Sequence, residues 1–259
     1  MSQKSQSTAK VKSRERFQLC HSDILTCLRN SRKLDTRGYQ GHIHAAQIGD
    51  KKVLIKSAAG WGIAVWINRW MLRREYRSYR RLDGVTGIPH CYGFFMNRYL
   101  VLEHIEGQTM RDACIVDRET FLAEMLDIIK VVHSRGVAHG DLKRKDNILI
   151  TRDSKPYLID FGVSALRKRG FRPLNYFWHG FCHQHDFNAW LKHKYGRDLV
   201  NMSPEDASLY KPLWSERLSR MIKKFYKKLT KGRKQYPQVK NRAIQKSYSL
   251  DPQQVNRHS

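Results

Sequence analysis

The sequence predicts an α+β protein with two lobes, a small β-rich N-terminal lobe and a helical C-terminal lobe. Two short runs of strand-forming residues flank a Gly-Asp turn between residues 42 and 56. Apolar residues at helical spacing indicate helices over 66–82 and 118–134. Residues 164–259 show no strand pattern and are expected to be helical and irregular. Strands with one helix therefore come first, and mostly helices follow.

In the N-terminal half, the expected hairpin occupies residues 36–58, with its turn at Gly49-Asp50. Its strands are His42–Ile48 and Val53–Lys56. After the helix over 66–82, Gly87-Ile88-Pro89 breaks the pattern, and two further strands are expected at Tyr92–Phe95 and Tyr99–His104.

In the C-terminal half, the helix over 118–134 has the clearest pattern. Its apolar residues lie along one side, and Gly136 occupies the position of a helix C-terminal glycine. Two short strands, Ile148–Ile150 and Tyr157–Ile159, follow it. The expected domain boundaries are a disordered basic tail (1–15), an N-lobe (16–105), a C-lobe (106–235) and a flexible basic tail (236–259).

The charge balance indicates polyanionic partners. The 259 residues include 49 Lys and Arg against 23 Asp and Glu, a formal net charge of +26. Such a surface attracts anions over long range. Nucleotide phosphates, an anionic membrane, a phosphorylated glycolipid and nucleic acid all fit, although nucleic acid is not favoured. Five scattered cysteines, no secretory signal and no long apolar run favour a cytoplasmic location.

Two motifs carry the chemistry. The first is His139-Gly140-Asp141-Leu142-Lys143-Arg144-Lys145-Asp146-Asn147, and the second is Asp160-Phe161-Gly162. Their order, and the apolar residues beside each, resemble the signature of protein kinases. The resemblance covers roughly residues 36–190. It implies a protein-kinase-like fold and phosphoryl transfer from ATP with Mg²⁺, a reaction in which the protein mainly positions groups and neutralises charge.

The resemblance assigns roles within these motifs. Asp141 would accept the proton of the attacking hydroxyl, and Lys143 would lie near the γ-phosphate. Asp160 and Asn147 would provide oxygen ligands for Mg²⁺. The family places its Asn five residues after the Asp, whereas here Asp146 is fifth and Asn147 sixth. Either the loop has one extra residue and Asn147 is the ligand, or Asp146 replaces it; we favour Asn147.

The strand Val53-Leu54-Ile55-Lys56 is similar to the family's V-A-I-K signature, which makes Lys56 the candidate for the α- and β-phosphates. Glu75, on the helix nineteen residues later, is positioned to pair with it. Taken alone, Lys56 would be a solvated strand residue and Glu75 one more charge on a basic helix. The two motifs favour the functional interpretation.

The remaining ATP contacts are assigned by position. Residues 36–41 keep only two glycines of a glycine-rich loop, Gly38 and Gly41, whose backbone amides can approach phosphates. A plain hairpin turn is the alternative. The segment 100–107, which includes Glu103, would join the lobes and bind adenine through its backbone.

The acceptor is less constrained than the donor. No A-P-E motif follows Gly162, and in this respect the sequence is similar to the compact bacterial and atypical kinases. The residues around Glu75 are similar to the lipopolysaccharide-core kinases, and our leading hypothesis is phosphorylation of a core sugar at the inner-membrane face. The alternative is a RIO-like serine/threonine protein kinase acting on a protein substrate, and a third hypothesis is a pseudokinase that only binds.

Three other features bear on surfaces. Residues 214–234 form a basic amphipathic pattern, with eight Lys or Arg and no acid between Arg220 and Lys234, which suits either an anionic membrane or ordinary packing. Trp61, Trp66 and Trp70 are expected in the core of the small lobe rather than at a membrane interface. The His- and Cys-rich run 179–185 matches no usual zinc spacing, and Asp186 after it is expected to orient the catalytic loop.

Overall fold

The computed structural model describes residues 21–30, 32–34, 41–58, 62–196, 198 and 201–212, all of which belong to one unit of the chain. Both predicted tails, the basic segment 214–234, Trp61 and Gly38 lie outside the described residues. The predicted domain boundaries therefore stay predictions.

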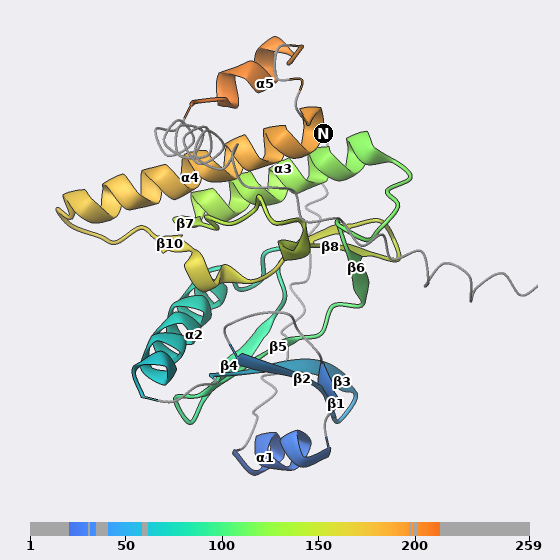
Figure 1. Ribbon diagram of the computed structural model, residues 1–259, viewed down its shortest axis with the longest axis vertical. Helices are drawn as coiled ribbons and strands as arrows, with labels where there is room; N and C mark the ends of the chain where they lie inside the picture. The colour runs from blue at the N-terminus through green and yellow to red at the C-terminus, as the bar shows by residue number, and fades with distance from the viewer. Residues whose placement is uncertain are drawn as a thin grey trace, which may run out of the picture. The chain divides into compact units, whose positions relative to one another are not determined.

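The described part contains ten strands and five α-helices (Figure 1). The strands are β1 Arg32–Leu34, β2 Gly41–Ile48, β3 Lys51–Ala58, β4 Cys91–Phe95, β5 Tyr99–Glu103, β6 Gly107–Thr109, β7 Val137–Ala138, β8 Ile148–Thr151, β9 Pro156–Leu158 and β10 Ala165–Leu166. The helices are α1 His21–Asn30, α2 Ile63–Arg81, α3 Arg118–Ser134, α4 Pro173–Tyr195 and α5 Pro204–Leu209. Two 3₁₀ turns are η1 Lys145–Asn147 and η2 Phe161–Val163.

The N-terminal lobe is an antiparallel five-stranded sheet in the order β1-β2-β3-β5-β4. The predicted β2–β3 hairpin forms, and Gly49 in its turn has a φ of +61°, a conformation that glycine adopts without steric cost. Both strands predicted after the helix also form, as β4 and β5. The helix α2 runs beside this sheet and contacts β3, β4 and β5 (Figure 1).

The expectation for the tryptophans is wrong for the two that are described. The side chains of Trp66 and Trp70 are 76% and 59% exposed, and Ile63 and Ile67 on the same helix are exposed as well. The reason is that α2 packs through its second half, where Glu75 and Tyr79 are buried. Its first half therefore presents an apolar stripe to solvent.

The C-terminal lobe is built on α3 and α4, which lie side by side (Figure 1). The helix α3 has the predicted bounds. The Asp117 side chain caps its start by accepting a hydrogen bond from the backbone N–H of Thr120, and Gly136 follows its end with a φ of +69°. The indole N–H of Trp190 donates to the carbonyl of Leu122 at 2.7 Å, which joins α4 to α3 in the core.

Small β elements complete this lobe. The sheet β6-β8-β9 contains the two predicted strands, whereas β10 pairs with β7 although residues after 164 were expected to contain no strand. The two-residue strands β7 and β10 are too short for an alternating pattern to show in the sequence. The α+β expectation, strands first and helices later, is confirmed. Within the described residues, no helix combines the length and apolar character needed to cross a bilayer.

Candidate active site

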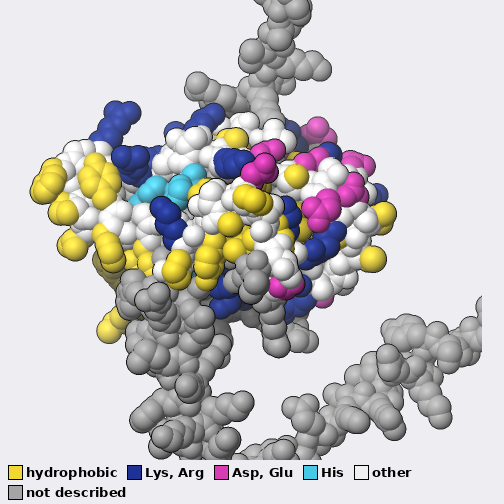
Figure 2. Space-filling view, turned by 90° about the horizontal axis from the view of Figure 1, so that it is seen from above, with side chains coloured by type: hydrophobic (Ala, Val, Ile, Leu, Met, Phe, Trp, Pro, Cys, Tyr) yellow, Lys and Arg dark blue, Asp and Glu magenta, His cyan; other side chains and the backbone are white. Residues whose placement is uncertain are grey.

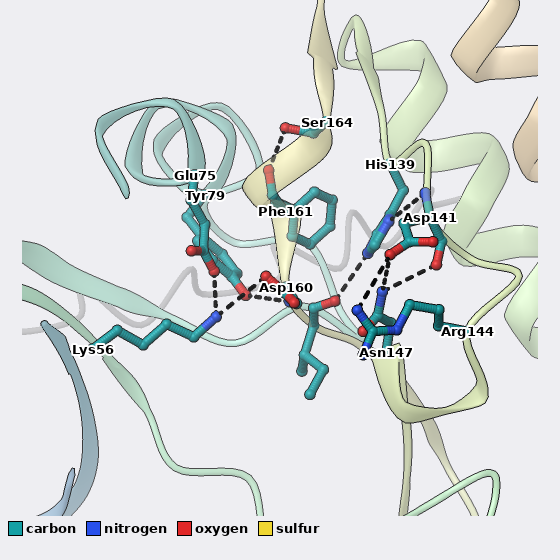
Figure 3. A network of polar contacts seen from close by, with 11 residues as sticks. Lys56, Glu75, Tyr79, His139, Asp141, Arg144, Asn147, Asp160, Phe161 and Ser164 are labelled. Atoms are coloured by element: carbon teal, nitrogen blue, oxygen red, sulfur yellow. Dashed lines mark hydrogen bonds and ion pairs between the residues drawn. The ribbon is translucent and has the colours of Figure 1, made fainter. Parts of the chain in front are cut away.

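Lys56, Glu75 and Asp160 meet where the two lobes face each other (Figure 3). The ammonium of Lys56, on β3, lies 2.6 Å from a carboxylate oxygen of Glu75 on α2 and 3.5 Å from Asp160. The Glu75 side chain is only 3% exposed. The pair expected from a spacing of nineteen residues is therefore present, and the same lysine also reaches the carboxylate of the second motif.

The charges of this group support one another. Burial opposes the charged form of Lys56, but the carboxylates of Glu75 and Asp160 outweigh it and raise the pKa of the ammonium. The Lys56 charge in turn is the main reason why the pKa of Asp160 is lowered, against the effect of burial. Lys56 is thus held as a cation and Asp160 as an anion at neutral pH.

The backbone at Asp160 is held in an uncommon conformation. Its φ is +66°, in the left-handed region that non-glycine residues seldom adopt. The Asp160 N–H donates to the hydroxyl of Tyr79 on α2 at 3.2 Å. The buried ring of Phe161 packs edge-on against Tyr79 and lies 4.5 Å from the ring of His139. These contacts fix the direction in which the Asp160 carboxylate points.

Asp141 and Asn147 form the second half of the site (Figure 3). The amide nitrogen of Asn147 donates to the backbone carbonyl of Asp141 at 3.0 Å and to its carboxylate Oδ2 at 3.3 Å. The guanidinium of Arg144 approaches the same oxygen at 4.0 Å. Partial burial raises the pKa of the Asp141 carboxyl, although the Arg144 guanidinium opposes the shift. Within the described residues, the side-chain contacts of this carboxylate from Asn147 and Arg144 both fall on Oδ2, which leaves Oδ1 as its free oxygen.

The two rivals for the second metal ligand are placed differently. Asn147 is 3% exposed and points to Asp141, whereas the carboxylate of Asp146 pairs with Arg111 at 2.6 Å. The Asn147 amide uses its nitrogen on Asp141, so its oxygen remains as an acceptor. Asn147, the sixth residue after Asp141, therefore lies beside Asp141, and Asp146, the fifth, does not.

His139 holds the loop that carries Asp141. Its ring is fully buried; Nε2 lies 2.9 Å from the carbonyl of Ile159, and Nδ1 accepts from the backbone N–H of Asp141 at 3.3 Å. A neutral ring with its proton on Nε2 satisfies both contacts. One side chain thus links the residue before Asp160 to Asp141 itself.

Asp186, on α4, anchors the same loop, as the sequence led us to expect. Its fully buried carboxylate accepts from the backbone N–H groups of His139 and Gly140 at 2.7 and 2.8 Å. The Nε2 atom of His133 on α3 lies 3.0 Å from the same carboxylate. Gly140 has a φ of +80°, a backbone conformation in which any residue with a side chain is strained, so this position favours glycine.

Three predicted site residues stand apart from this network. Lys143 is exposed, two residues after Asp141. The Glu103 side chain accepts from the backbone N–H of His90 at 2.9 Å and so closes the end of β5 against β4. Gly41 is the first residue of β2 and pairs with Ala58 of β3. This position in a strand does not test its predicted contact with phosphates. The sequence therefore identified the site's charged centre, while these three roles stay predictions.

Several contributing residues on α2 and η2 were missed. Arg74 donates to the backbone carbonyls of Val163 and Ser164 at 2.8 and 2.6 Å. The hydroxyls of Ser78 and Ser164 lie 2.7 Å apart in the core. Ser78, at i+3 relative to Glu75, lies on the helix face that carries Glu75, which was the signal available in the sequence.

The donor set fits a divalent cation and a nucleotide. Mg²⁺ prefers oxygen ligands, and the site offers the ionised carboxylate of Asp160 and the amide oxygen of Asn147. Lys56 supplies a fixed positive charge for phosphate oxygens. A two-lobed fold with these residues defines the class of ATP-dependent phosphotransferases.

Comparison with known proteins agrees with this class. The family model described as "Protein kinase domain" matches residues 47–189, more than half of the chain, and the chain belongs to that family. The match contains Lys56, Glu75, Asp141, Asn147 and Asp160.

The curated relatives that match the chain include serine/threonine-protein kinases and a CDPK-related kinase. Serine/threonine-protein kinase D of Synechocystis sp. is 38% identical over 82 residues, which are 29% of this chain and 16% of that protein. Serine/threonine-protein kinase PknA of Nostoc sp. is 34% identical over 105 residues, 35% of this chain and 18% of that protein. CDPK-related kinase 5 of Arabidopsis thaliana is 28% identical over 152 residues, 54% of this chain and 23% of that protein. This chain thus spans less than a quarter of each.

Proposed function

We propose that the chain is an ATP- and Mg²⁺-dependent kinase that transfers the γ-phosphate to a serine or threonine hydroxyl of a protein. The observation that carries the proposal is the chain of contacts from Glu75 through Lys56 to Asp160, beside an Asp141 carboxylate oriented by Asn147. The names of the relatives support a protein acceptor over a sugar.

The residues have the following proposed roles. Lys56 binds the α- and β-phosphates, because Glu75 holds its ammonium charged and in place. Asp160 and Asn147 hold Mg²⁺, which neutralises phosphate charge when bound. Asp141 accepts the proton of the attacking hydroxyl, at the oxygen that Asn147 and Arg144 leave free.

Two further contacts complete the proposal. Lys143 is exposed two residues after Asp141, where an ammonium can reach the γ-phosphate. The backbone of the segment 100–107 binds adenine beside Glu103, and Gly38 and Gly41 cover the phosphates. Only eight residues, 165–172, separate Ser164 from the start of α4. This short connection supports a compact kinase of the RIO-like type.

A second candidate acceptor is a sugar hydroxyl of a lipopolysaccharide-core glycolipid, reached at the cytoplasmic face of an inner membrane. It is favoured by the exposed Trp66 and Trp70, since tryptophan suits the interface between lipid and water. Arg73 and Arg77 on the same helix are exposed and suit anionic lipid. The basic segment 214–234 would add to this contact.

The test is a transfer assay with labelled ATP and three acceptors side by side: a serine-rich protein, core-bearing glycolipid in micelles, and a free sugar. We expect label in phosphoserine or phosphothreonine of the protein. Label in glycolipid with none in protein would establish the second candidate and overturn the first. No transfer to any acceptor by a protein that binds ATP would favour the pseudokinase.

A further inference from the structure

A basic pocket of about 480 Å³ lies outside the candidate active site, where the ends of α2 and α3 meet the segment between β10 and α4. Its charged lining is Arg81, Arg135, Arg167, Lys168 and Arg169, joined by His133. No carboxylate lines it. None of the residues proposed to bind ATP or Mg²⁺ belongs to this lining.

The walls of the pocket are held by hydrogen bonds. The Nη1 atom of Arg81 donates to the carbonyls of Gly136 and Arg167 at 3.2 and 2.9 Å, so this guanidinium is fixed across the junction of α2, α3 and β10. The guanidinium of Arg167 lies over the ring of Tyr176 at 5.5 Å. The hydroxyl of Tyr176 donates to the carbonyl of Gly170 at 2.7 Å.

The segment that carries Lys168 and Arg169 is also tied to the first turn of α4. The Asn175 side chain accepts from the backbone N–H of Lys168 at 2.8 Å and donates to the carbonyl of Leu166 at 3.0 Å. Gly170 turns the chain with a φ of +77°. The backbone of three consecutive cations is therefore ordered before any ligand arrives, which lowers the entropy that binding would cost.

The charges of the pocket are uncompensated. Elsewhere Lys56, Arg111, Lys155 and Lys194 each pair with a carboxylate. None of the five lysines and arginines of the pocket makes an ion pair with a carboxylate in the described part of the chain. Like charges this close repel one another, so an anion bound between them relieves the repulsion and gains charge-assisted hydrogen bonds.

We propose that this pocket binds a phosphate group. Phosphate offers three or four acceptor oxygens in a compact, multiply charged group, and arginine guanidinium forks match that geometry. The site is distinct from the ATP site, so the proposal stands whatever acceptor the kinase uses.

The position of the pocket connects it to the catalytic loop. His133 lines the pocket, and its Nε2 contacts the Asp186 carboxylate that holds the backbone of His139 and Gly140. Arg81 lies on the helix that carries Glu75. A bound phosphate joins these elements, so it stabilises the junction that positions both halves of the active site.

The phosphate can be soluble or belong to a lipid headgroup, and the surroundings bear on the choice. Phe171 and Leu174, next to Gly170, are 93% and 85% exposed. Figure 2 shows hydrophobic side chains gathered at the end of the molecule where α4 begins, with Lys and Arg side chains close by. Of the two sources of phosphate, only a lipid also offers acyl chains that these apolar side chains can contact. Binding to vesicles therefore distinguishes a lipid headgroup from soluble phosphate.

The test measures the Tm of the nucleotide-free protein in a titration with inorganic phosphate. A parallel titration with chloride at the same ionic strength is the reference. The pocket variant is Lys168→Gln with Arg169→Gln. The control variant, Lys130→Gln with Arg152→Gln, removes the same charge from exposed residues that do not line the pocket. A second arm measures sedimentation with phosphatidylcholine vesicles that contain phosphatidylglycerol.

We expect phosphate to raise the Tm of the wild type and of the control variant. The pocket variant should be at least as stable as the wild type in chloride, because two mutually repelling charges are gone. It should bind phosphate at least about tenfold more weakly, since two charged contacts are lost. Equal responses of the pocket and control variants would overturn the proposal, as would a chloride response equal to that of phosphate. Vesicle binding that the pocket variant loses would identify a lipid headgroup as the source, and phosphate binding without vesicle binding would identify a soluble one.

Discussion

The carboxylate of Asp186 accepts a hydrogen bond from the backbone N–H of His139 at 2.7 Å, across 47 residues of sequence. Together with its bond from Gly140, this contact ties the catalytic loop to α4. Both lobes' catalytic residues are thus positioned by buried polar contacts, those of Asp186 in the C-terminal lobe and those of Lys56 and Glu75 in the N-terminal lobe.

Replacement of Asp186 by Ala should lower the free energy of unfolding by about 3 kcal/mol or more, because two buried N–H groups lose a charged acceptor. Asp186→Asn keeps one acceptor oxygen and should cost less. Urea unfolding followed by fluorescence measures both. An Ala variant that unfolds at the wild-type urea concentration would show that the loop does not depend on this anchor.

Lys56→Met should reduce phosphoryl transfer by about 10²–10³-fold, the loss seen when one charge-stabilising group is removed. Glu75→Gln should reduce it less, because the amide oxygen still accepts from the ammonium. If Glu75 acts only through Lys56, adding Glu75→Gln to Lys56→Met changes nothing further. A further additive loss in the double variant would contradict the pairing as the role of Glu75.

Asn147→Ala should raise the Mg²⁺ concentration needed for half-maximal transfer and lower the maximal rate. Asp146→Ala should leave both near the wild-type values, since that carboxylate pairs with the exposed Arg111 and such pairs contribute at most about 1 kcal/mol to stability. Steady-state rates across a Mg²⁺ titration distinguish the variants. The reverse pattern would make Asp146 the ligand.

The pH dependence of stability should report on Asp160. Its pKa is lowered, chiefly by Lys56, below the usual 3.8. The ionised form is therefore favoured in the folded state, so its contribution is fully present above about pH 5 and is lost as the pH falls through the lowered pKa. The stability advantage of the wild type over Asp160→Asn should shrink below about pH 4. An advantage that stays constant or grows on acidification would contradict the ion pair with Lys56.

Much of the site could be predicted because its residues are fixed by chemistry at short spacing. Asp141, Asn147 and Asp160 lie within twenty residues, and each type is required by its proposed task. Glu75 was identified from its place on the predicted helix, nineteen residues after Lys56, because a half-buried lysine needs a carboxylate partner. The predicted bounds of α3 are those of the structure, because its apolar periodicity, its Asp117 cap and the glycine after it all indicate the same helix.

Other features depend on contacts that the sequence does not encode locally. Tyr79 resembled an ordinary core residue, yet its hydroxyl accepts from Asp160 across 81 residues. Trp66 and Trp70 have the composition of a core and are exposed, because α2 turns its other face to the sheet and to η2. The basic pocket joins the ends of three elements, so no sequence window contains it.

The most direct test of the central claim, that this chain transfers phosphate with Asp141 as the proton acceptor, is the rate of transfer from labelled ATP by the wild type and by Asp141→Asn. We predict transfer by the wild type and a loss of about 10²–10⁴-fold in the variant, with ATP affinity retained. Equal rates in the two proteins, whether both transfer phosphate or neither does, would contradict the account.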